Sequence, residues 1–288
     1  MKRKINEIKL LKYVIIMCLV LNISDKFYLE YFYEKILLSK RIKKLPLIKI
    51  FIMTHKDFKN RRYNNAYVIV GDDKSKIKNR YNLTVLFAER GYLYNKSRAY
   101  GEMAKLNYIY QLYKEGNISS KYIGLNHYSR YFEFTDKIPD LDKIFINNDV
   151  ILPRRSILNG SIMKRYCLGH ICKNFIDVMD IIKIKHPDYY KTALKVAKEN
   201  KIYYFNIFIM KKEDFFKYCE FMFDILSEFD KRYNFKTDKD ILNYTYNIFH
   251  QTKIAYRQSR LQGFLSERLS NIFYNKHFKR IKEYKLRG

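Results

Sequence analysis

Short runs of apolar, mostly β-branched or aromatic residues recur along the chain, each bounded by polar residues or by glycine and proline. Such runs are typical of buried strands. They predict strands over residues 47–53, 66–70, 122–125, 149–152 and 203–210. Between them, apolar residues follow the helical period over residues 101–115, 161–200 (broken at His186-Pro187-Asp188), 212–232 and 263–273. This alternation predicts an α/β fold with a mostly parallel sheet flanked by helices.

The polar residues directly after the predicted strands are candidates for a binding site, because ligands of parallel sheets lie beyond the carboxyl ends of the strands. They are Thr54, His55 and Lys56; Asp72 and Asp73; and residues 127–130. In the last group, Arg130 offers a fork of N–H donors that matches phosphate oxygens, and His127 can donate to an oxyanion or transfer a proton. Tyr128 can stack on a base or a sugar ring. A structural histidine beside a solvated arginine would give the same local pattern.

A second candidate group lies in the last predicted helix, where Gly263 is followed by adjacent Ser266, Glu267 and Arg268. Glu267 would serve as a general base if a partly buried site raised its pKa, and Arg268 would hold a phosphate. The residues alone favour a plainer interpretation. In it, the helix dipole stabilises Glu267 near the helix start, and solvent surrounds Arg268.

Three acidic pairs have side chains of the type that binds Mg²⁺ or Mn²⁺. They are Asp72 with Asp73, Asp140 with Asp142, and Asp238 with Asp240. None follows a predicted strand as an Asp-x-Asp motif, so solvated carboxylates are the favoured interpretation and the metal stays open. The chain also lacks the glycine-rich phosphate motifs, H-E-x-x-H and G-x-S-x-G. Any phosphate site must therefore depend on side chains and helix N-termini.

The net charge of +28, from 57 basic and 29 acidic residues, favours anionic partners such as nucleic acid, anionic lipid or phosphorylated substrates. The basic residues are spread along the whole chain, which fits a solvated lysine-rich surface equally well. The aromatic content of 17% argues against disorder. The cysteines are too few for a disulfide framework and predict reduced, mostly buried thiols in a cytoplasmic protein. They are Cys18, Cys167, Cys172 and Cys219.

The two ends of the chain are basic. Residues 1–46 predict a helical N-terminal extension that ends at Pro46. Its apolar run, residues 10–23, is interrupted by Lys12 and is too short to span a membrane. We expect a helix that packs on the domain or lies in the membrane interface. Residues 276–288 read as a basic tail that would add attraction to anionic lipid.

Residues 122–132 (YIGLNHYSRYF) resemble the YxGLxHYRRYF signature of a capsular and exopolysaccharide synthesis family. That family is catalogued as a domain of unknown function and grouped with GT-A-like glycosyltransferases. Further segments agree with it in order: residues 48–56, 101–114, 206–226 and 263–269, the last reading GFLSERL. The resemblance covers about residues 47–275 and implies a GT-A-like, Rossmann-like fold for that domain.

The resemblance also implies roles for individual residues. Thr54, His55 and Lys56 would border the nucleotide, and Glu102, His127, Arg130 and Asn206 would line the donor site. Glu267 and Arg268 would close that site, and Tyr128 and His170 would face the acceptor or the cleft. In this scheme Glu267 activates the acceptor hydroxyl, and His127 acts with Arg130 on the leaving diphosphate. Mg²⁺ or Mn²⁺ would be a possible cofactor.

The function implied is transfer of a hexose from a nucleotide diphosphate sugar, most simply a UDP-sugar, to a lipid-linked or lipopolysaccharide acceptor. The enzyme would act in surface polysaccharide synthesis, peripherally at the cytoplasmic face of the plasma membrane. Ser129 stands where the family has an arginine, and Tyr108 stands where it has tryptophan. Residues 93–97 lack the family's acidic residue. These departures leave a non-catalytic assembly protein as an alternative. Specific nucleic-acid binding is disfavoured, since the chain has no such fold motif.

Overall fold

The computed structural model describes residues 47–59, 63–78, 81–134 and 137–288. Within it, Leu47–Gly288 forms one compact unit. The predicted N-terminal extension, with its apolar run and Cys18, lies outside the described residues. In the described part of the chain, no helix combines the length and the apolar character that crossing a bilayer requires.

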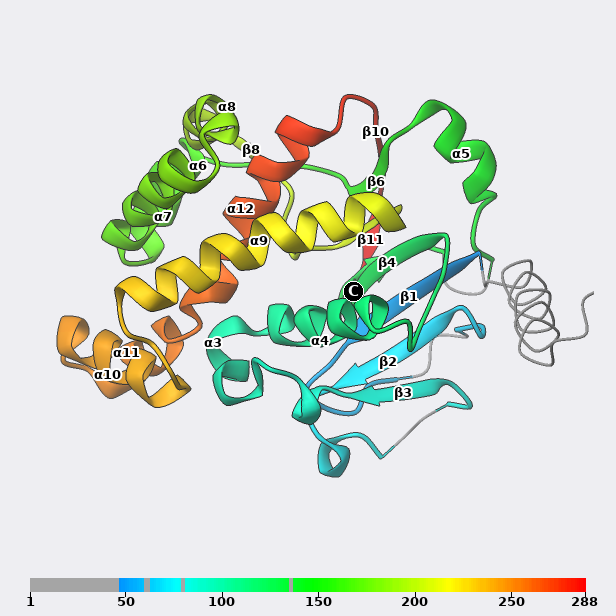
Figure 1. Cartoon of the computed structure of the whole chain (residues 1–288), viewed down its shortest axis with the longest axis horizontal. Helices are drawn as coiled ribbons and strands as arrows, with labels where there is room; N and C mark the ends of the chain where they lie inside the picture. Colours follow the sequence, from blue (N-terminus) through cyan, green and yellow to red (C-terminus); the bar gives the residue numbers. More distant parts are fainter. Residues whose placement is uncertain (1–46, 60–62, 79–80, 135–136) are drawn as a thin grey trace, which may run out of the picture. The chain divides into compact units, whose positions relative to one another are not determined.

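A seven-stranded sheet forms the centre of this unit, in the order β10-β6-β9-β4-β1-β2-β3 (Figure 1). Its strands are β1 (Ile48–Met53), β2 (Tyr67–Gly71), β3 (Thr84–Phe87), β4 (Tyr122–His127), β6 (Val150–Pro153), β9 (Phe208–Lys211) and β10 (Ile281–Tyr284). β9 runs antiparallel to β4 and β6, and the other neighbours pair in parallel. The predicted α/β class with a mostly parallel sheet is confirmed.

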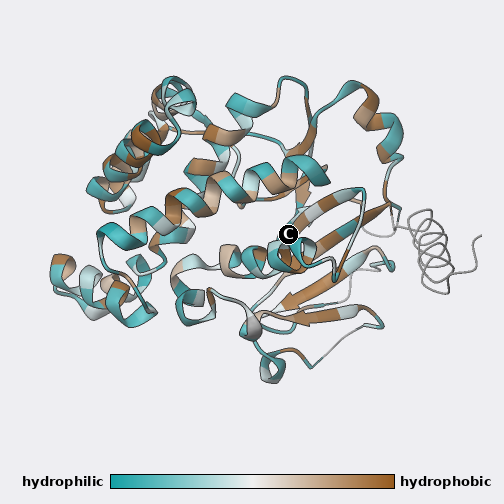
Figure 2. Ribbon diagram, viewed as in Figure 1, coloured by the Kyte–Doolittle hydropathy of each residue, from teal (hydrophilic) through white to brown (hydrophobic). Residues whose placement is uncertain are grey.

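Both faces of the sheet are covered, which explains why its strands read as continuous apolar runs. In β1, Ile50 and Ile52 belong to one apolar cluster, whereas Phe51 and Met53 belong to the other. Figure 2 shows β2 as mainly hydrophobic, and all five of its residues are buried. The parallel pairing of β1 with β4 aligns Met53 with His127, so the residues after both strands meet at one edge.

The helices are α3 (Ser97–Tyr100), α4 (Glu102–Lys114), α5 (Leu141–Asn147), α6 (Ile162–Gly169), α7 (Cys172–Lys185), α8 (Pro187–Lys198), α9 (Lys212–Arg232), α10 (Asp238–Phe249), α11 (Thr252–Gln258) and α12 (Leu261–His277). α4, α9 and α12 contribute to the larger apolar cluster on one face of the sheet. Pro187 begins α8, where the missing N–H of proline costs little. A capping box of Thr237 and Asp240 begins α10.

The structure differs from the predicted elements in three further places. The strand expected over residues 203–210 is reduced to β9, because Phe205 and Asn206 adopt left-handed backbone angles, with φ of 74° and 51°. The long helical region breaks a second time, between α6 and α7. The sheet also gains β3, an edge strand whose partly exposed residues give a weaker apolar signal.

The predicted basic tail is wrong for the described structure. α12 continues to His277, β10 pairs with β6, and β11 (Leu286–Arg287) pairs with β5 (Tyr131–Phe132). β10 carries two adjacent charged residues, Lys282 and Glu283, which suits an edge strand with one partner in the central sheet. The end of the described chain therefore belongs to the folded domain.

The prediction of reduced cysteines is also wrong in one place, since Cys167 and Cys172 form a disulfide. α6 ends at Gly169 and α7 begins at Cys172, so the break between the helices brings the two Cα atoms to 4.2 Å. Cys219 is a free, buried thiol, as expected.

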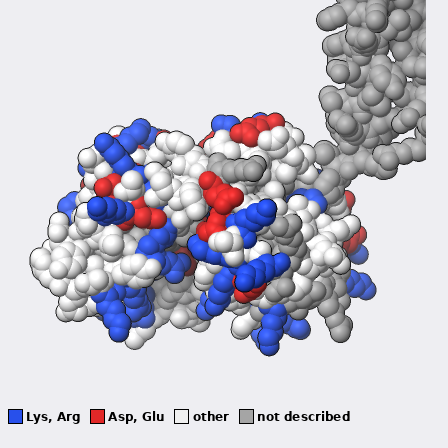
Figure 3. All heavy atoms as spheres, turned by 90° about the horizontal axis from the view of Figure 1, so that it is seen from below, with Lys and Arg blue, Asp and Glu red and all other residues white. Residues whose placement is uncertain are grey.

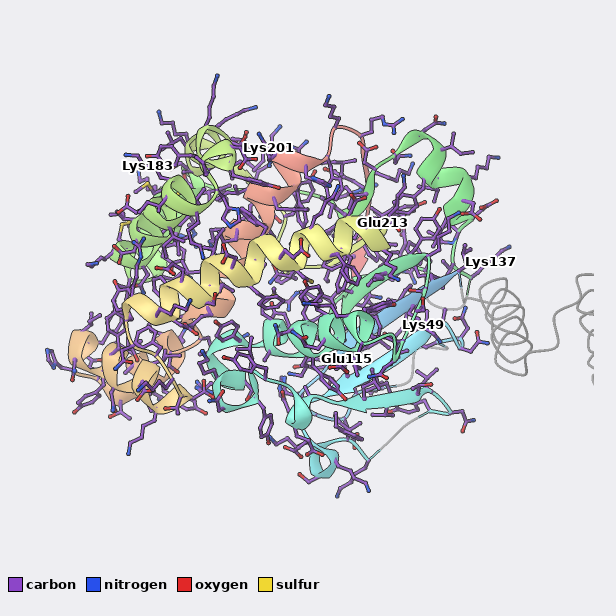
Figure 4. All side chains as sticks on the ribbon, viewed as in Figure 1. Lys49, Glu115, Lys137, Lys183, Lys201 and Glu213 are labelled. Carbon is purple, nitrogen blue, oxygen red and sulfur yellow. A yellow bond between two sulfur atoms is a disulfide. The ribbon has the colours of Figure 1, made fainter. Side chains whose placement is uncertain are left out.

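The basic residues do not gather into a single stripe on the face drawn in Figure 3, where acidic side chains lie among them. Lys183, Lys201 and Glu213 are exposed and come from three different elements, α7, β8 (Lys201–Ile202) and α9 (Figure 4). Much of the net charge is thus distributed over the surface.

Candidate active site

Two adjoining cavities lie beyond the carboxyl ends of the parallel strands. The first cavity has a volume of about 650 Å³ and is lined by residues that follow β1, β2 and β4 and by residues of α4. The second cavity, of about 540 Å³, is lined mainly by α6, the Tyr204–Phe205 segment and α12. Both are lined by Glu102, His127, Arg130 and Arg260. The shared wall makes them two compartments of one cleft.

A tight turn at the end of β4 places His127 and Arg130 on this shared wall. The His127 N–H donates to the Arg130 carbonyl oxygen at 2.8 Å, and the Tyr128 N–H donates to the Met53 carbonyl oxygen at 3.1 Å. The next residues, Tyr131 and Phe132, form β5 and are anchored by β11. The chain is thus fixed on both sides of the turn, which explains why the two side chains share one cleft.

The left-handed pair Phe205 and Asn206 connects the other predicted site residues. The Arg130 guanidinium lies over the Phe205 ring, 4.3 Å from its centroid. The Phe205 N–H donates to Glu267 Oε1 at 3.3 Å, and Asn206 Nδ2 donates to Glu102 Oε1 at 2.9 Å. Left-handed non-glycine residues persist where surrounding contacts hold them, and they concentrate at functional sites. Phe205 is a site residue that the sequence did not indicate.

Asn206 is expected to line the donor site, but its side chain lies behind that wall and is only 2% exposed. Besides donating to Glu102, its amide donates to Ser266 Oγ at 3.1 Å and accepts a hydrogen bond from Ser270 Oγ at 2.6 Å. These contacts from α12 fix the amide orientation. Asn206 therefore orients the Glu102 carboxylate and does not face the cavities directly.

Glu267 and Arg268 both line the second cavity, and they form an ion pair, with Arg268 Nη1 and Glu267 Oε2 2.9 Å apart. Arg268 is buried and also donates to the Phe264 carbonyl oxygen at 2.9 Å. Burial raises the pKa of the Glu267 carboxyl above its usual value, and the neighbouring Arg268 opposes that shift. A carboxylate with a raised pKa is a stronger base, which suits proton transfer from a hydroxyl.

The histidines of the cleft favour their neutral forms. Burial lowers the pKa of His127, and the Glu102 carboxylate partly opposes this effect. Burial, followed by the nearby Lys105 ammonium, lowers the pKa of His55. Burial lowers the pKa of His170 to about 4. His170 lines the second cavity and stacks on Phe264 with 4.0 Å between ring centroids.

The residues after β1 divide between the first cavity and its rim. Thr54, His55 and Tyr128 line the first cavity, and the rings of the last two meet edge to face at 5.1 Å. Lys56 does not line it; its ammonium lies 5.7 Å from the centroid of the Tyr128 ring. The Thr54 hydroxyl accepts the Lys56 N–H at 3.2 Å, which makes Thr54 a turn residue as well as a wall residue.

The acidic pairs do not fit a divalent cation. Asp72 lines the first cavity but forms an ion pair with Lys105 at 2.5 Å, and the Lys105 side chain is only 6% exposed. Asp142 pairs with Lys121, at the start of β4. Asp238 accepts the N–H groups that begin α3, and Asp240 caps α10. In the described segments, no group of three His, Cys, Asp or Glu side chains could hold a metal ion.

Most of the cationic residues that line the cleft were not among the site residues predicted from the sequence. They are Lys76, Arg98, Lys105, Arg165, Arg257 and Arg260. Lys105 gave no signal, because it lies off the apolar side of the predicted helix formed by Met103, Leu106 and Ile109, where a lysine is ordinary. The arginines gave no signal in the sequence either, because they come from separate elements that lie close together only in the folded protein.

No curated protein sequence matches the chain. Among solved structures, the WbbM bifunctional glycosyltransferase in its apo form is similar, with a TM-score of 0.63 and 18% identity over 83% of this chain. The chain spans 45% of that protein's length, and this likeness shows the fold. The mannosyltransferase Ktr4p from S. cerevisiae matches 64% of the chain at 12% identity, with a TM-score of 0.34. The profile of the family described as "Domain of unknown function (DUF4422)" matches residues 49–278, and the chain belongs to that family.

Proposed function

We propose that this protein is a glycosyltransferase that moves a hexose from a nucleotide diphosphate sugar to a lipid-linked or lipopolysaccharide acceptor. The observation that carries the proposal is the two-compartment cleft, which has Glu102, His127 and Arg130 on its shared wall. Two substrates that must exchange a sugar need two adjoining sites with the reacting atoms at the junction. The fold likeness to the WbbM bifunctional glycosyltransferase supports the same reaction class.

The first cavity is the proposed donor site. It lies at the carboxyl edge of the parallel strands, where nucleotides bind in such folds. Lys76, Arg98 and Lys105 line it together with the two shared arginines. These cations suit a diphosphate, and Tyr94 and Tyr256 offer rings for the base. A UDP-sugar is the proposed donor.

The second cavity is the proposed acceptor site, with Glu267 as the base. The acceptor hydroxyl oxygen forms a bond to the anomeric carbon of the hexose, and the bond from that carbon to the diphosphate oxygen breaks. The hydroxyl proton passes to the Glu267 carboxylate, and the electron pair leaves with the nucleoside diphosphate. His127 and Arg130 stabilise that negative charge by donating hydrogen bonds. No step passes through Mg²⁺ or Mn²⁺, because Lys105 already holds Asp72.

The proposed setting is surface polysaccharide synthesis at the cytoplasmic face of the plasma membrane, with the protein bound peripherally. The motif resemblance and the net charge of +28 support it. The second candidate function is a non-catalytic role in polysaccharide assembly. Ser129 favours it, because its hydroxyl lies 3.4 Å from His127 Nδ1 on the wall of the first cavity, where the family has a guanidinium.

The proposal is tested by thermal-shift titration with a panel of nucleotide sugars, with and without Mn²⁺, followed by transfer and hydrolysis assays. We expect one uridine diphosphate sugar to raise the Tm and to be consumed. Binding without turnover, under every acceptor tried, would support the assembly role. If no nucleotide sugar raises the Tm while DNA does so in low salt, the transferase proposal is wrong.

A further inference from the structure

Four arginines surround the second cavity without a carboxylate partner in the part of the chain that the structure describes. They are Arg130, Arg165, Arg257 and Arg260. They come from the turn after β4, from α6, from α11 and from the residue before α12. Four separate elements thus direct the same charge toward one concave surface. Such a surface focuses a positive potential that an anionic ligand would neutralise.

The two carboxylates of the second cavity do not meet this need. Glu267 is paired with the buried Arg268, and Glu102 forms no ion pair with any of the four arginines in the described segments. Arg130 and Arg260 also line the first cavity, so the diphosphate of the donor would occupy them. Arg165 and Arg257 line only the second cavity and are exposed. Those two guanidinium groups are therefore left for a second anion.

Several aromatic rings also line the second cavity. Phe264 stacks on His170, and Tyr204 and Phe205 lie on the same lining. Aromatic faces beside guanidinium groups suit a sugar ring that carries a charged substituent, because the ring packs on the apolar face while the charge meets the arginine fork. A purely neutral glycan would leave the arginines paired only with water and would gain nothing from their charge.

We propose that the second cavity binds an acceptor glycan that carries an anionic group, a phosphate or a carboxylate, which Arg165 and Arg257 recognise. This inference rests on the proposed function, since it assigns the acceptor to the second cavity. It adds a substrate class and two specificity residues that take no part in the reacting bonds.

The test uses three probes that share one decyl chain: a diphosphate-linked N-acetylglucosamine, a glucuronide, and a neutral glucoside. Their Kd values are measured by isothermal titration calorimetry with the whole chain. The variant is Arg165→Gln with Arg257→Gln. Its matched control is Lys191→Gln with Lys198→Gln, which removes the same charge from exposed positions on α8 that line neither cavity. Lys76→Gln, which changes only the first cavity, shows whether a probe binds there.

We expect at least one anionic probe to bind about tenfold more tightly than the glucoside, and we expect the arginine variant alone to lose that preference. The tighter of the two anionic probes identifies phosphate or carboxylate as the source. Equal binding of all three probes, no binding of either anionic probe, or a preference that survives in the arginine variant would overturn the inference. A preference that is lost in Lys76→Gln would also overturn it, because the probe would then bind in the first cavity.

The binding test needs no turnover, so its failure is distinct from failure of the proposed function. Nucleotide-sugar binding is measured separately by thermal shift. If a donor binds and is consumed while the arginine variant behaves like its control, only the acceptor inference fails. If no nucleotide sugar binds while the arginine-dependent preference persists, the transferase proposal fails and the anion site stands.

Discussion

The two cavities differ in how their charges are balanced. In the first cavity, Lys105 is paired with Asp72, and Lys76 is paired with Asp73. In the second cavity, Arg165 and Arg257 have no carboxylate partner in the described part of the chain. Carboxylates of the protein thus hold the two lysines of the first cavity, whereas only a ligand could pair with Arg165 and Arg257. Fixed cations preorganise a site for a constant diphosphate, and unpaired cations make binding depend on what the ligand brings.

The largest effect that would test this comparison is expected at Glu267, the proposed base in the second cavity. Glu267→Gln keeps the shape and the hydrogen-bond acceptor for Phe205 but removes the base. We expect kcat to fall by about 10²–10⁴-fold with little change in donor Kd. Because burial raises the pKa of Glu267, wild-type activity should decline with falling pH at values above those of an ordinary glutamate. Unchanged turnover in the variant would remove Glu267 from the chemistry.

The next effect concerns the paired charges of the first cavity. Lys105→Met leaves Asp72 without its partner, so we expect unfolding free energy to fall by about 3 kcal/mol and donor binding to weaken. Adding Asp72→Asn should restore stability, measured by urea unfolding, but not donor affinity. If the double variant binds the nucleotide sugar as wild type does, Lys105 holds the fold and not the donor.

A smaller effect is expected where Asn206 orients Glu102. Asn206→Gly relaxes the left-handed backbone but removes the amide, whereas Asn206→Ala removes the amide and adds strain. We expect both variants to lose roughly tenfold in kcat/KM, with only the alanine variant clearly less stable by thermal melting. Full activity in the glycine variant would show that the backbone conformation matters and the amide does not.

A further effect, confined to acidic pH, is expected in the stability of the fold. Burial lowers the pKa of His170 to about 4, so the unfolded chain binds a proton there before the folded protein does. Stability should therefore be lost as pH falls from about 6.5 toward 4. His170→Gln should flatten that loss in urea unfolding at pH 7 and pH 5. Parallel curves for the variant and wild type would contradict this assignment.

The central strands were predictable because burial on both faces requires a continuous run of apolar residues, which is visible in the sequence. β1, β2, β4 and β6 follow from that rule, and the site residues after β1 and β4 follow from the common edge of parallel strands. His127, Arg130 and Glu267 were named from motifs, and they line one cavity. Their catalytic roles stay predictions.

Other features depend on contacts between distant segments and could not be read locally. Nothing in residues 203–210 except the asparagine indicates the left-handed pair, which delays the start of the strand to Phe208. Arg165 and Arg257 look like ordinary surface residues until α6 and α11 meet at the second cavity. The disulfide depends on the break between α6 and α7, which the apolar period does not reveal.

The pairing of β11 with β5 gives the cleft a particular order of assembly. The turn that carries His127 and Arg130 is held in place by Leu286 and Arg287, which come from the far end of the described chain. Contacts between segments so distant in sequence form late in folding. The first cavity would thus acquire its final shape only after β11 has paired with β5. A bulky group attached beside Arg287 would therefore disturb the turn that carries His127 and Arg130.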